Sequence, residues 1–380
     1  MLLLLTNRQY AGGKLHDEEI DPGEIRLFEV ELKHTKYEHY TYEWEEEELE
    51  YKTKVKPILV PHEDRDHGYA SILAKLSNED KAKPWVFFVH GNNQSADKNI
   101  VKCIKLHDTH KVNVIAFSWP SKPALDFTNR ALVAALKAFF KNPSPTTIAK
   151  KIIKEFIDAK SDAYQQARQN AKDSVTQLKT AFEESFEKLF NHISGCKKSL
   201  LVHSLGHLLY REFSSAHGPF IRQLEFSNAI FHQGDEEYAE KDTWINDGDM
   251  SYVSQKIFVT HNRRDGILLL SEFEKFYSNT VQNNTPRRLG RGNGPFSVAT
   301  GNKIHHIEFT GVDVDSPFCH NYFVVSEETN SDVYTVMNGL LTSQDVGNSF
   351  DGFDEPGTRY YKGIVEKPEP EDFFEESEDF

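Results

Sequence analysis

A serine at position 204 lies where a hydroxyl group could act as a nucleophile. The apolar run Ser199 to Val202 leads into His203-Ser204-Leu205-Gly206, and an apolar segment with helical spacing follows. This pattern is typical of a nucleophile elbow, a sharp turn that lifts the serine hydroxyl above the sheet. The backbone N–H of Leu205 would then face a developing oxyanion at the start of a helix. The pattern Gly-x-Ser-x-Gly is kept except at its first position, where Val202 replaces glycine.

A second segment could complete an oxyanion hole. The buried strand expected at Trp85 to Val89 ends in His90-Gly91-Asn92-Asn93. A loop in this position supplies a second backbone N–H to the oxyanion, and here the donor is Asn92 or Asn93. We expect His90 to pack or to hydrogen-bond locally rather than to take part in catalysis.

The remaining partners of such a serine follow it in the order acid, then histidine. Asp265 comes after the expected strand Lys256 to Thr260, where a carboxylate could hold the Nδ1–H of a catalytic base. Asp235, after the preceding strand, is the alternative acid. His320 is the only histidine that follows the last expected core strand, Ile304 to Phe309, so a base in that region must be His320.

Short apolar runs alternate with helical segments from residue 84 onward, which predicts an α/β fold with a mainly parallel sheet covered by helices on both faces. Apolar residues that step by three or four from Tyr164 to Leu189 predict one long amphipathic helix. We expect residues 1–352 to form a single domain.

The remaining segments are assigned from composition. A buried first strand is expected near residue 5, a loop at residues 9–24, and one or two exposed antiparallel strands within residues 25–60. Residues 124–160 form two helical pieces broken at prolines, which predicts a helical insertion or a lid. Residues 353–380 are expected to be a flexible acidic tail.

Charge and cysteine content limit the partners. The net charge of −15 argues against general nucleic-acid binding. Three cysteines without a CxxC pair suit a reducing compartment, so we expect a cytoplasmic protein. No apolar stretch is long enough to span a membrane. Seven basic residues against two acids within residues 130–160 could steer anionic substrates or make a peripheral membrane contact.

The sequence gives little support for a zinc site, a phosphate-binding loop or a thiol nucleophile. The segment His62 to His67 lacks the spacing of a helical zinc site, and no lysine-serine of a phosphate loop follows the glycines at residues 290–294. A thiol nucleophile at Cys319 is disfavoured because adjacent loop residues seldom hydrogen-bond productively. The sequence therefore predicts neither a metal nor a cofactor.

Together these motifs resemble the α/β-hydrolase superfamily, and specifically a bacterial family of uncharacterised α/β hydrolases that opens with a short strand and Thr-Asn-Arg. The matching segments are Leu4-Leu-Thr-Asn-Arg8, Phe88-Val-His-Gly-Asn92, Phe117-Ser-Trp-Pro-Ser121, His203-Ser-Leu-Gly206, Asn262-Arg-Arg-Asp265 with Leu270-Ser271, Arg287-Arg-Leu-Gly290 and His320-Asn-Tyr322. The resemblance implies a Ser204, Asp265 and His320 triad with esterase- or lipase-like activity, and it supplies no substrate. We expect the substrate to be a small-molecule or lipid ester. The alternative is a non-catalytic hydrolase-fold scaffold that binds a protein or a lipid.

Overall fold

The structure is a computed structural model, and it describes most of the segments that carry the motifs above. The described residues are 1–21, 24–33, 56–92, 94–121, 162–193, 195–221, 223–236, 253–262, 265–268, 271–272, 288–291, 304–309, 320–343, 350–353 and 358–361. The predicted insertion at residues 124–160 lies outside them, as do Asn93 and Cys319.

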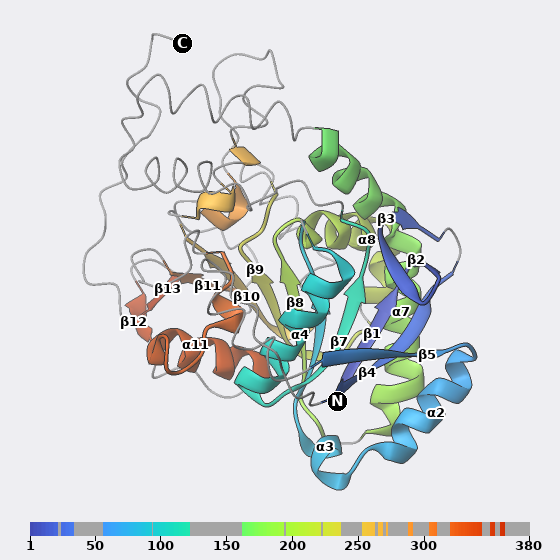
Figure 1. Cartoon of the computed structure of the whole chain (residues 1–380). Coiled ribbons are helices and arrows are strands. Elements are labelled where there is room, and N and C mark those ends of the chain that lie inside the picture. Colours follow the sequence, from blue (N-terminus) through green and yellow to red (C-terminus); the bar gives the residue numbers. More distant parts are fainter. Residues whose placement is uncertain are drawn as a thin grey trace, which may run out of the picture.

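A single large sheet crosses the described part of the molecule (Figure 1), in the strand order β12–β13–β11–β10–β9–β8–β6–β7–β1–β4–β5. Neighbouring strands from β13 through β11, β10, β9, β8, β6 and β7 to β1 are parallel to each other. At the two edges, β12 is antiparallel to β13, β4 to β1, and β5 to β4. The predicted mainly parallel sheet is therefore confirmed. The bounds are β1 (Leu2–Thr6), β4 (Arg26–Lys33), β5 (Lys56–His62), β6 (Trp85–Val89), β7 (Asn113–Ser118), β8 (Lys198–His203), β9 (Phe226–His232), β10 (Ser254–His261), β11 (Ile304–Glu308), β12 (Phe350–Phe353) and β13 (Thr358–Tyr361).

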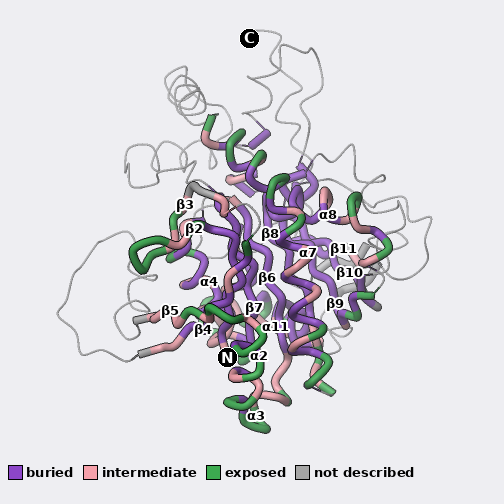
Figure 2. Tube along the Cα trace, turned by 90° about the vertical axis from the view of Figure 1, so that its right-hand side faces the viewer, coloured by how far each residue is buried: buried purple, intermediate pink, exposed green. Residues whose placement is uncertain are grey.

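Helices cover both faces of the sheet because successive strand side chains point to opposite sides. Leu3 and Leu5 of β1 join one buried apolar cluster, and Leu2 and Leu4 join another. In Figure 2 the buried strands run between α4 on one side and α7 with α8 on the other. One face is covered by α4 (Ala96–His110) and α11 (Ser331–Thr342), and the other by α2 (Arg65–Lys75), residues 162–173, α7 (Val175–Glu184) and α8 (Gly206–Ile221). A short helix, α3 (Asn78–Ala82), precedes β6.

The long helix predicted from Tyr164 to Leu189 is interrupted. The helical residues 162–173 end at a turn at Ser174, α7 follows, and the chain then passes through a π-helical turn, η1 (Ser185–Leu189), and a 3-10 turn, η2 (Phe190–His192). Ser174 donates its hydroxyl to the carbonyl of Asn170 at 2.7 Å and accepts from the amide of Asn7 at 2.8 Å. A serine that bonds back to the carbonyl four residues earlier bends a helix, which accounts for the break.

Residues 9–24 were expected to be a loop, and this prediction is wrong over most of its length. They form a two-stranded hairpin of β2 (Arg8–Ala11) and β3 (Lys14–Ile20). Gly12 and Gly13 both have positive φ, at 59° and 76°, which suits the tight turn between the strands. The polar composition concealed the hairpin because its side chains are largely solvent-facing.

Antiparallel strands were predicted within residues 25–60, and β4 and β5 confirm the pairing. However, β4 is not an exposed strand, because Leu27 and Phe28 are fully buried against β1. At the opposite side of the sheet, β12 and β13 extend the sheet past residue 352, where the tail was expected to begin. Residues 362–380 lie outside the described part of the chain, and the single-domain boundary stays a prediction.

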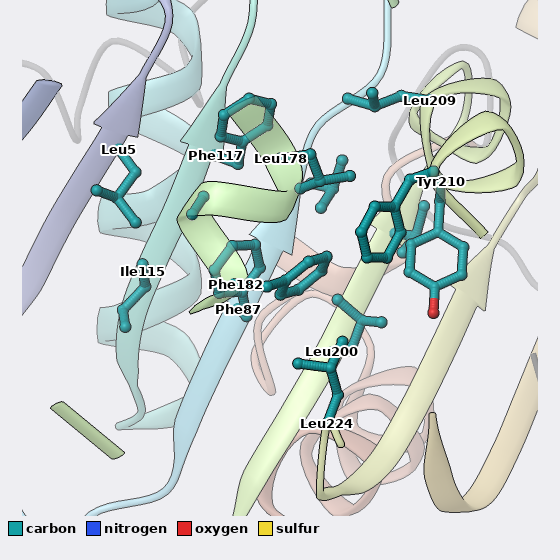
Figure 3. Packing of buried hydrophobic residues seen from close by; sticks show 14 of the residues in the cluster. Leu5, Phe87, Ile115, Phe117, Leu178, Phe182, Leu200, Leu209, Tyr210 and Leu224 are labelled. Carbon is teal, nitrogen blue, oxygen red and sulfur yellow. The ribbon is translucent and has the colours of Figure 1, made fainter. Parts of the chain in front are cut away.

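Aromatic rings fill the core between the sheet and α7 (Figure 3). Phe182 of α7 stacks on Phe87 of β6 with ring centroids 4.4 Å apart, and it also contacts Phe213 and Phe226. All of these side chains are buried. This cluster holds α7 and α8 against the strands that end at the candidate site.

We predict that Phe182→Ala lowers the free energy of unfolding by about 3–5 kcal/mol, because it removes transfer energy and leaves a cavity. Urea denaturation followed by circular dichroism measures the change. The control is Thr176→Ala on the exposed side of the same helix, which should stay within about 0.5 kcal/mol of the parent. Equal losses in the two variants would contradict this account of the core.

Candidate active site

Ser204 sits in a left-handed turn between β8 and α8, with φ at +51°. A non-glycine residue in this conformation costs of order 1–3 kcal/mol and persists only where its surroundings enforce it. Three backbone hydrogen bonds do so: Ser204 N–H donates to the carbonyl of His232, and the Ser204 carbonyl accepts from His207 N–H and Asp235 N–H. The turn is therefore held by α8 and by the loop after β9.

Two glycines allow the chain to close tightly around this turn. A Cβ on Gly206 would lie 2.7 Å from the carbonyl oxygen of His90, and one on Gly91 would lie 2.6 Å from Ser204 Cβ and 3.1 Å from Ser204 Oγ. The Val202 side chain, by contrast, is part of the apolar core of the sheet. The close contacts at Ser204 thus fall on Gly206 and Gly91, and valine is accommodated two residues before the serine.

The loop after β6 therefore lies directly against Ser204, and His90 fixes its start. The Nε2 atom of His90 accepts from Trp119 N–H at 3.1 Å, so the ring proton is on Nδ1, which donates to the Gly91 carbonyl at 2.8 Å. Because the Gly91–Asn92 peptide is trans, its N–H points away from the His90 ring. His90 also stacks on Trp119 with centroids 5.3 Å apart. The histidine thus sets the plane of the peptide that carries the Asn92 N–H.

The structure describes two of the three residues that were predicted to supply oxyanion donors. Leu205 is buried at the start of α8, and Asn92 is partly buried in the loop beside Ser204. Within the described part of the chain, neither the Leu205 N–H nor the Asn92 N–H donates to a protein acceptor. An oxyanion hole requires uncommitted N–H donors close to the serine hydroxyl, and Leu205 and the Gly91–Asn92 loop are the segments next to it.

Asp265 and His320 lie in direct contact although 55 residues separate them. His320 Nδ1 is 2.6 Å from Asp265 Oδ2, and Asp265 Oδ1 accepts from the N–H groups of Ile267 and Leu268 at 3.0 Å each. With the proton on Nδ1, the Nε2 atom of His320 is left as a base. Burial raises the pKa of Asp265, while the charge and hydrogen bond of His320 oppose the rise.

His203 connects this pair to the serine. It precedes Ser204, its Nε2 atom lies 2.9 Å from the backbone carbonyl of His320, and the two imidazole centroids are 4.6 Å apart. No direct hydrogen bond joins Ser204 to His320 among the described residues. Catalytic hydrogen bonds of this kind often tighten only when substrate is bound. The structure thus brings Asp265 and His320 together and places His320 in contact with His203, the residue that precedes the serine.

Asp235, the alternative acid, has other partners. Its carboxylate accepts from Tyr164 Oη at 2.8 Å and from Ser271 Oγ at 2.7 Å, and the guanidinium of Arg288 lies 3.1 Å away. Burial favours a higher pKa for Asp235, but the Arg288 charge and the two hydrogen bonds outweigh it and lower the pKa. None of the contacts described for Asp235 includes His320.

Tyr164, Ser271 and Arg288 were not predicted to belong to one network. Tyr164 appeared only as the first residue of an apolar stripe, although a buried tyrosine hydroxyl requires a partner. Arg288 begins the segment 288–291, which crosses the ends of β9 and β10. Leu289 N–H donates to the Glu236 carbonyl, Gly290 N–H to the Gly234 carbonyl, and the Gly290 carbonyl accepts from Asn262 N–H. This segment, which includes η5 (Leu289–Arg291), ties together the loops that carry both aspartates.

Burial keeps four side chains at this edge of the sheet neutral: His90, His203, His207 and His232. Burial lowers the pKa of His90, His203 and His232 well below the ordinary range, and it lowers the pKa of His207 to about 3. Neighbouring imidazoles and Lys102 contribute further to the lowering at His203. The site is therefore a dry environment in which electrostatic interactions are stronger than in water.

The described residues form neither a metal site nor a membrane-spanning helix. Among the described residues, no group of three or more His, Cys, Asp or Glu side chains is arranged to hold a metal ion. The helices in the same part of the chain include none long and apolar enough to cross a bilayer. The basic segment at residues 130–160, which could steer anionic substrates or contact a membrane, lies outside the described residues.

Comparison with known protein families identifies the class. Residues 66–331 match the family described as "Alpha/beta hydrolase of unknown function (DUF900)". The match covers more than half of the chain, so the protein belongs to this family and has the α/β-hydrolase fold that the resemblance implied. Neither the curated proteins nor the solved structures gave a match.

The neutral histidines make stability dependent on pH. In the unfolded chain a histidine titrates near pH 6.5, whereas His207 in the folded protein stays neutral down to about pH 3. We predict that the contribution of these histidines to the free energy of unfolding is fully present above about pH 6.5. It is lost as the pH falls, because only the unfolded state takes up these protons. Each such group contributes a slope of up to about 1.4 kcal/mol per pH unit.

Urea denaturation at several pH values between about 8 and 5 tests this slope. His207→Gln should make the fall in stability shallower by about 1.4 kcal/mol per pH unit below pH 6. Leu208→Ala, on the same helix, should lower stability by about 2–5 kcal/mol at every pH without changing the slope. An unfolding free energy that stays flat from pH 8 to pH 5 would show that the buried histidines do not control it.

Proposed function

We propose that the protein is a serine hydrolase that cleaves carboxylic esters through an acyl-enzyme, with Ser204 as nucleophile, His320 as base and Asp265 as the acid that orients it. The observation that carries the proposal is the 2.6 Å contact between His320 Nδ1 and Asp265 Oδ2 beside a serine held at positive φ. The N–H groups of Leu205 and Asn92 support it, because neither donates to an acceptor in the described part of the chain and both belong to segments next to the serine. Asn93 is kept as an alternative donor.

The first half-reaction transfers the acyl group to the enzyme. His320 Nε2 takes the proton of the Ser204 hydroxyl as Oγ forms a bond to the ester carbonyl carbon. The carbonyl electron pair moves onto oxygen, and the N–H groups of Leu205 and Asn92 stabilise this oxyanion. When the electron pair returns, the bond to the leaving alkoxy oxygen breaks and His320 gives its proton to the departing alcohol.

The second half-reaction restores the serine. His320 takes a proton from water while the water oxygen attacks the acyl carbon, and the same N–H groups hold the second oxyanion. The bond from carbon to Ser204 Oγ then breaks, Oγ regains the proton from His320, and the carboxylic acid leaves. Asp265 holds Nδ1–H throughout and stabilises the imidazolium that forms in both halves.

The substrate belongs to the class of small-molecule or lipid esters. Ester cleavage suits an imidazole base and two N–H donors, because the developing charge is a single oxyanion. The members of the family are described by their fold and not by a substrate. Rates on p-nitrophenyl esters of increasing acyl length, with a phospholipid panel beside them, would separate a short-chain esterase from a lipase.

We predict that a fluorophosphonate probe labels the wild-type protein and fails to label Ser204→Ala, because the probe needs an activated serine. The labelled peptide is identified by mass spectrometry. Ser199→Ala is the matched control, since Ser199 is buried in the same strand, away from the elbow, and should remain labelled through Ser204. A folded wild-type protein that takes up no probe would favour the non-catalytic scaffold instead.

The two buried aspartates should behave differently. We predict that Asp265→Asn lowers kcat by about 10³–10⁴-fold, because an amide no longer selects the required His320 tautomer. Asp235→Asn should change kcat less than about tenfold and mainly lower stability, since it leaves the Arg288 charge buried without its carboxylate. Steady-state kinetics on the folded fraction of each variant measure the difference. A larger kcat loss for Asp235→Asn would assign the catalytic role to Asp235.

A further inference from the structure

Arg8 is a buried arginine far in sequence from the proposed triad, and its side chain is fully inaccessible to solvent. Its guanidinium makes four hydrogen bonds to three other elements. Nε donates to Ser118 Oγ at 3.0 Å, Nη1 to the Asp17 carbonyl and Asp17 Oδ1 at 3.2 Å each, and Nη2 to the Gln94 carbonyl at 2.7 Å. The shortest of these bonds reaches the loop that lies against Ser204.

The end of that loop is held from several directions. The Gln94 carbonyl accepts from Arg8 and from Ser121 Oγ, and Ser121 Oγ in turn accepts from Gln94 N–H. Asp17, the ion-pair partner of Arg8, accepts from Ala96 N–H at 2.8 Å. Arg8 and Asp17 together therefore bind a carbonyl and an N–H on either side of Ser95, the N-cap of α4.

The beginning of the same loop is fixed by His90 and Trp119, as described above. Asn92 lies between the two fixed ends, only two residues before Gln94. Only one residue separates Asn92 from Gln94, and consecutive Cα atoms are about 3.8 Å apart, so a displacement of Gln94 would pull on the Asn92 peptide. The position of the Asn92 N–H relative to Ser204 thus depends on Arg8 at one end of the loop as well as on His90 at the other.

We propose that Arg8 is a positioning residue that sets the distance from the Asn92 N–H to the oxyanion formed at Ser204. This inference rests on the proposed function. It extends the catalytic apparatus into the N-terminal hairpin, because Arg8 and Asp17 precede residues 66–331, the part that matches the family.

Arginine is suited to this task for two reasons. Burial lowers the pKa of Arg8 to about 10, opposed by Asp17, so the guanidinium still carries its charge at neutral pH. Its planar group also presents donors in several fixed directions, whereas lysine offers a compact point charge on a flexible stem. Lysine could neutralise Asp17 but could not hold Ser118, Asp17 and Gln94 in one geometry.

The test compares Arg8→Lys and Asp17→Asn with the wild type. Asn at position 17 keeps an acceptor for Ala96 N–H and loses the charge that pairs with Arg8, and the Asp17 side chain is 37% exposed, so this variant should fold. The matched control is Asn7→Ala, which removes a buried hydrogen bond to Ser174 from the neighbouring position without touching the loop. Thermal melts give the folded fraction of each protein.

Three readouts are measured: the second-order rate of Ser204 labelling by a fluorophosphonate, kcat and KM on the p-nitrophenyl ester that the wild type cleaves fastest, and the pH profile of kcat. A donor displaced by about 1 Å can cost about 100-fold. We expect Arg8→Lys and Asp17→Asn to lower the labelling rate and kcat by about 10–100-fold, with KM within about threefold. The shape of the pH profile should not change, because His320 and Asp265 keep their contacts.

The outcomes separate the two proposals. If the wild type is labelled at Ser204 and the Arg8 and Asp17 variants lose no more activity per folded molecule than Asn7→Ala, Arg8 has only a structural role and the inference is overturned. A rise in KM with unchanged kcat and labelling rate would overturn it as well. If the folded wild type neither reacts with the probe nor cleaves any ester, the proposed function fails, and the positioning role fails with it.

Discussion

The left-handed backbone of Ser204 is the constraint on which the rest of the candidate site depends. A residue in this conformation turns the chain sharply between β8 and α8, so the side chain leaves the sheet at its carboxyl edge. The turn is possible only because Gly206 lets the helix approach the His90 carbonyl and Gly91 lets the neighbouring loop approach Ser204. The unfavourable conformation is thus maintained by contacts from three separate segments, and the same contacts bring the loop that carries Asn92 against the serine.

Two aspartates follow adjacent parallel strands, and their surroundings give them opposite chemistry. Asp265 is buried next to the His320 imidazole, and burial raises the pKa of its carboxyl group. Asp235 is buried next to a guanidinium that is always charged, and its pKa is lowered. The negative charge of such a carboxylate is balanced permanently by the neighbouring cation. The carboxylate beside His320, by contrast, can respond when that ring takes up a proton.

Much of this arrangement could be predicted from the sequence because it depends on local patterns. Apolar runs predict buried strands, parallel strands share a carboxyl edge, and Ser204, Asp265 and His320 each follow one of these strands. The partners of Arg8 and of Asp235 could not be predicted, because those hydrogen bonds join residues up to 110 and 71 positions apart and leave no periodic signal. The hairpin at β2 and β3 was missed for a related reason: its strands are short and polar, and among its described apolar side chains only Tyr10 and Leu15 pack against the core, which is too few for a hydrophobic pattern.

The position of β1 inside the sheet limits where the chain could be cut without exposing a sheet edge. This strand precedes the part that matches the family, yet it lies in the interior of the sheet between β7 and β4. A fragment that began at residue 66 would leave one whole side of β7 with open backbone groups, which is the kind of edge that recruits other chains and aggregates. During synthesis the first strand must also wait for more than a hundred residues before its parallel neighbour emerges. Assembly of the sheet therefore cannot proceed simply in the order in which the chain is made.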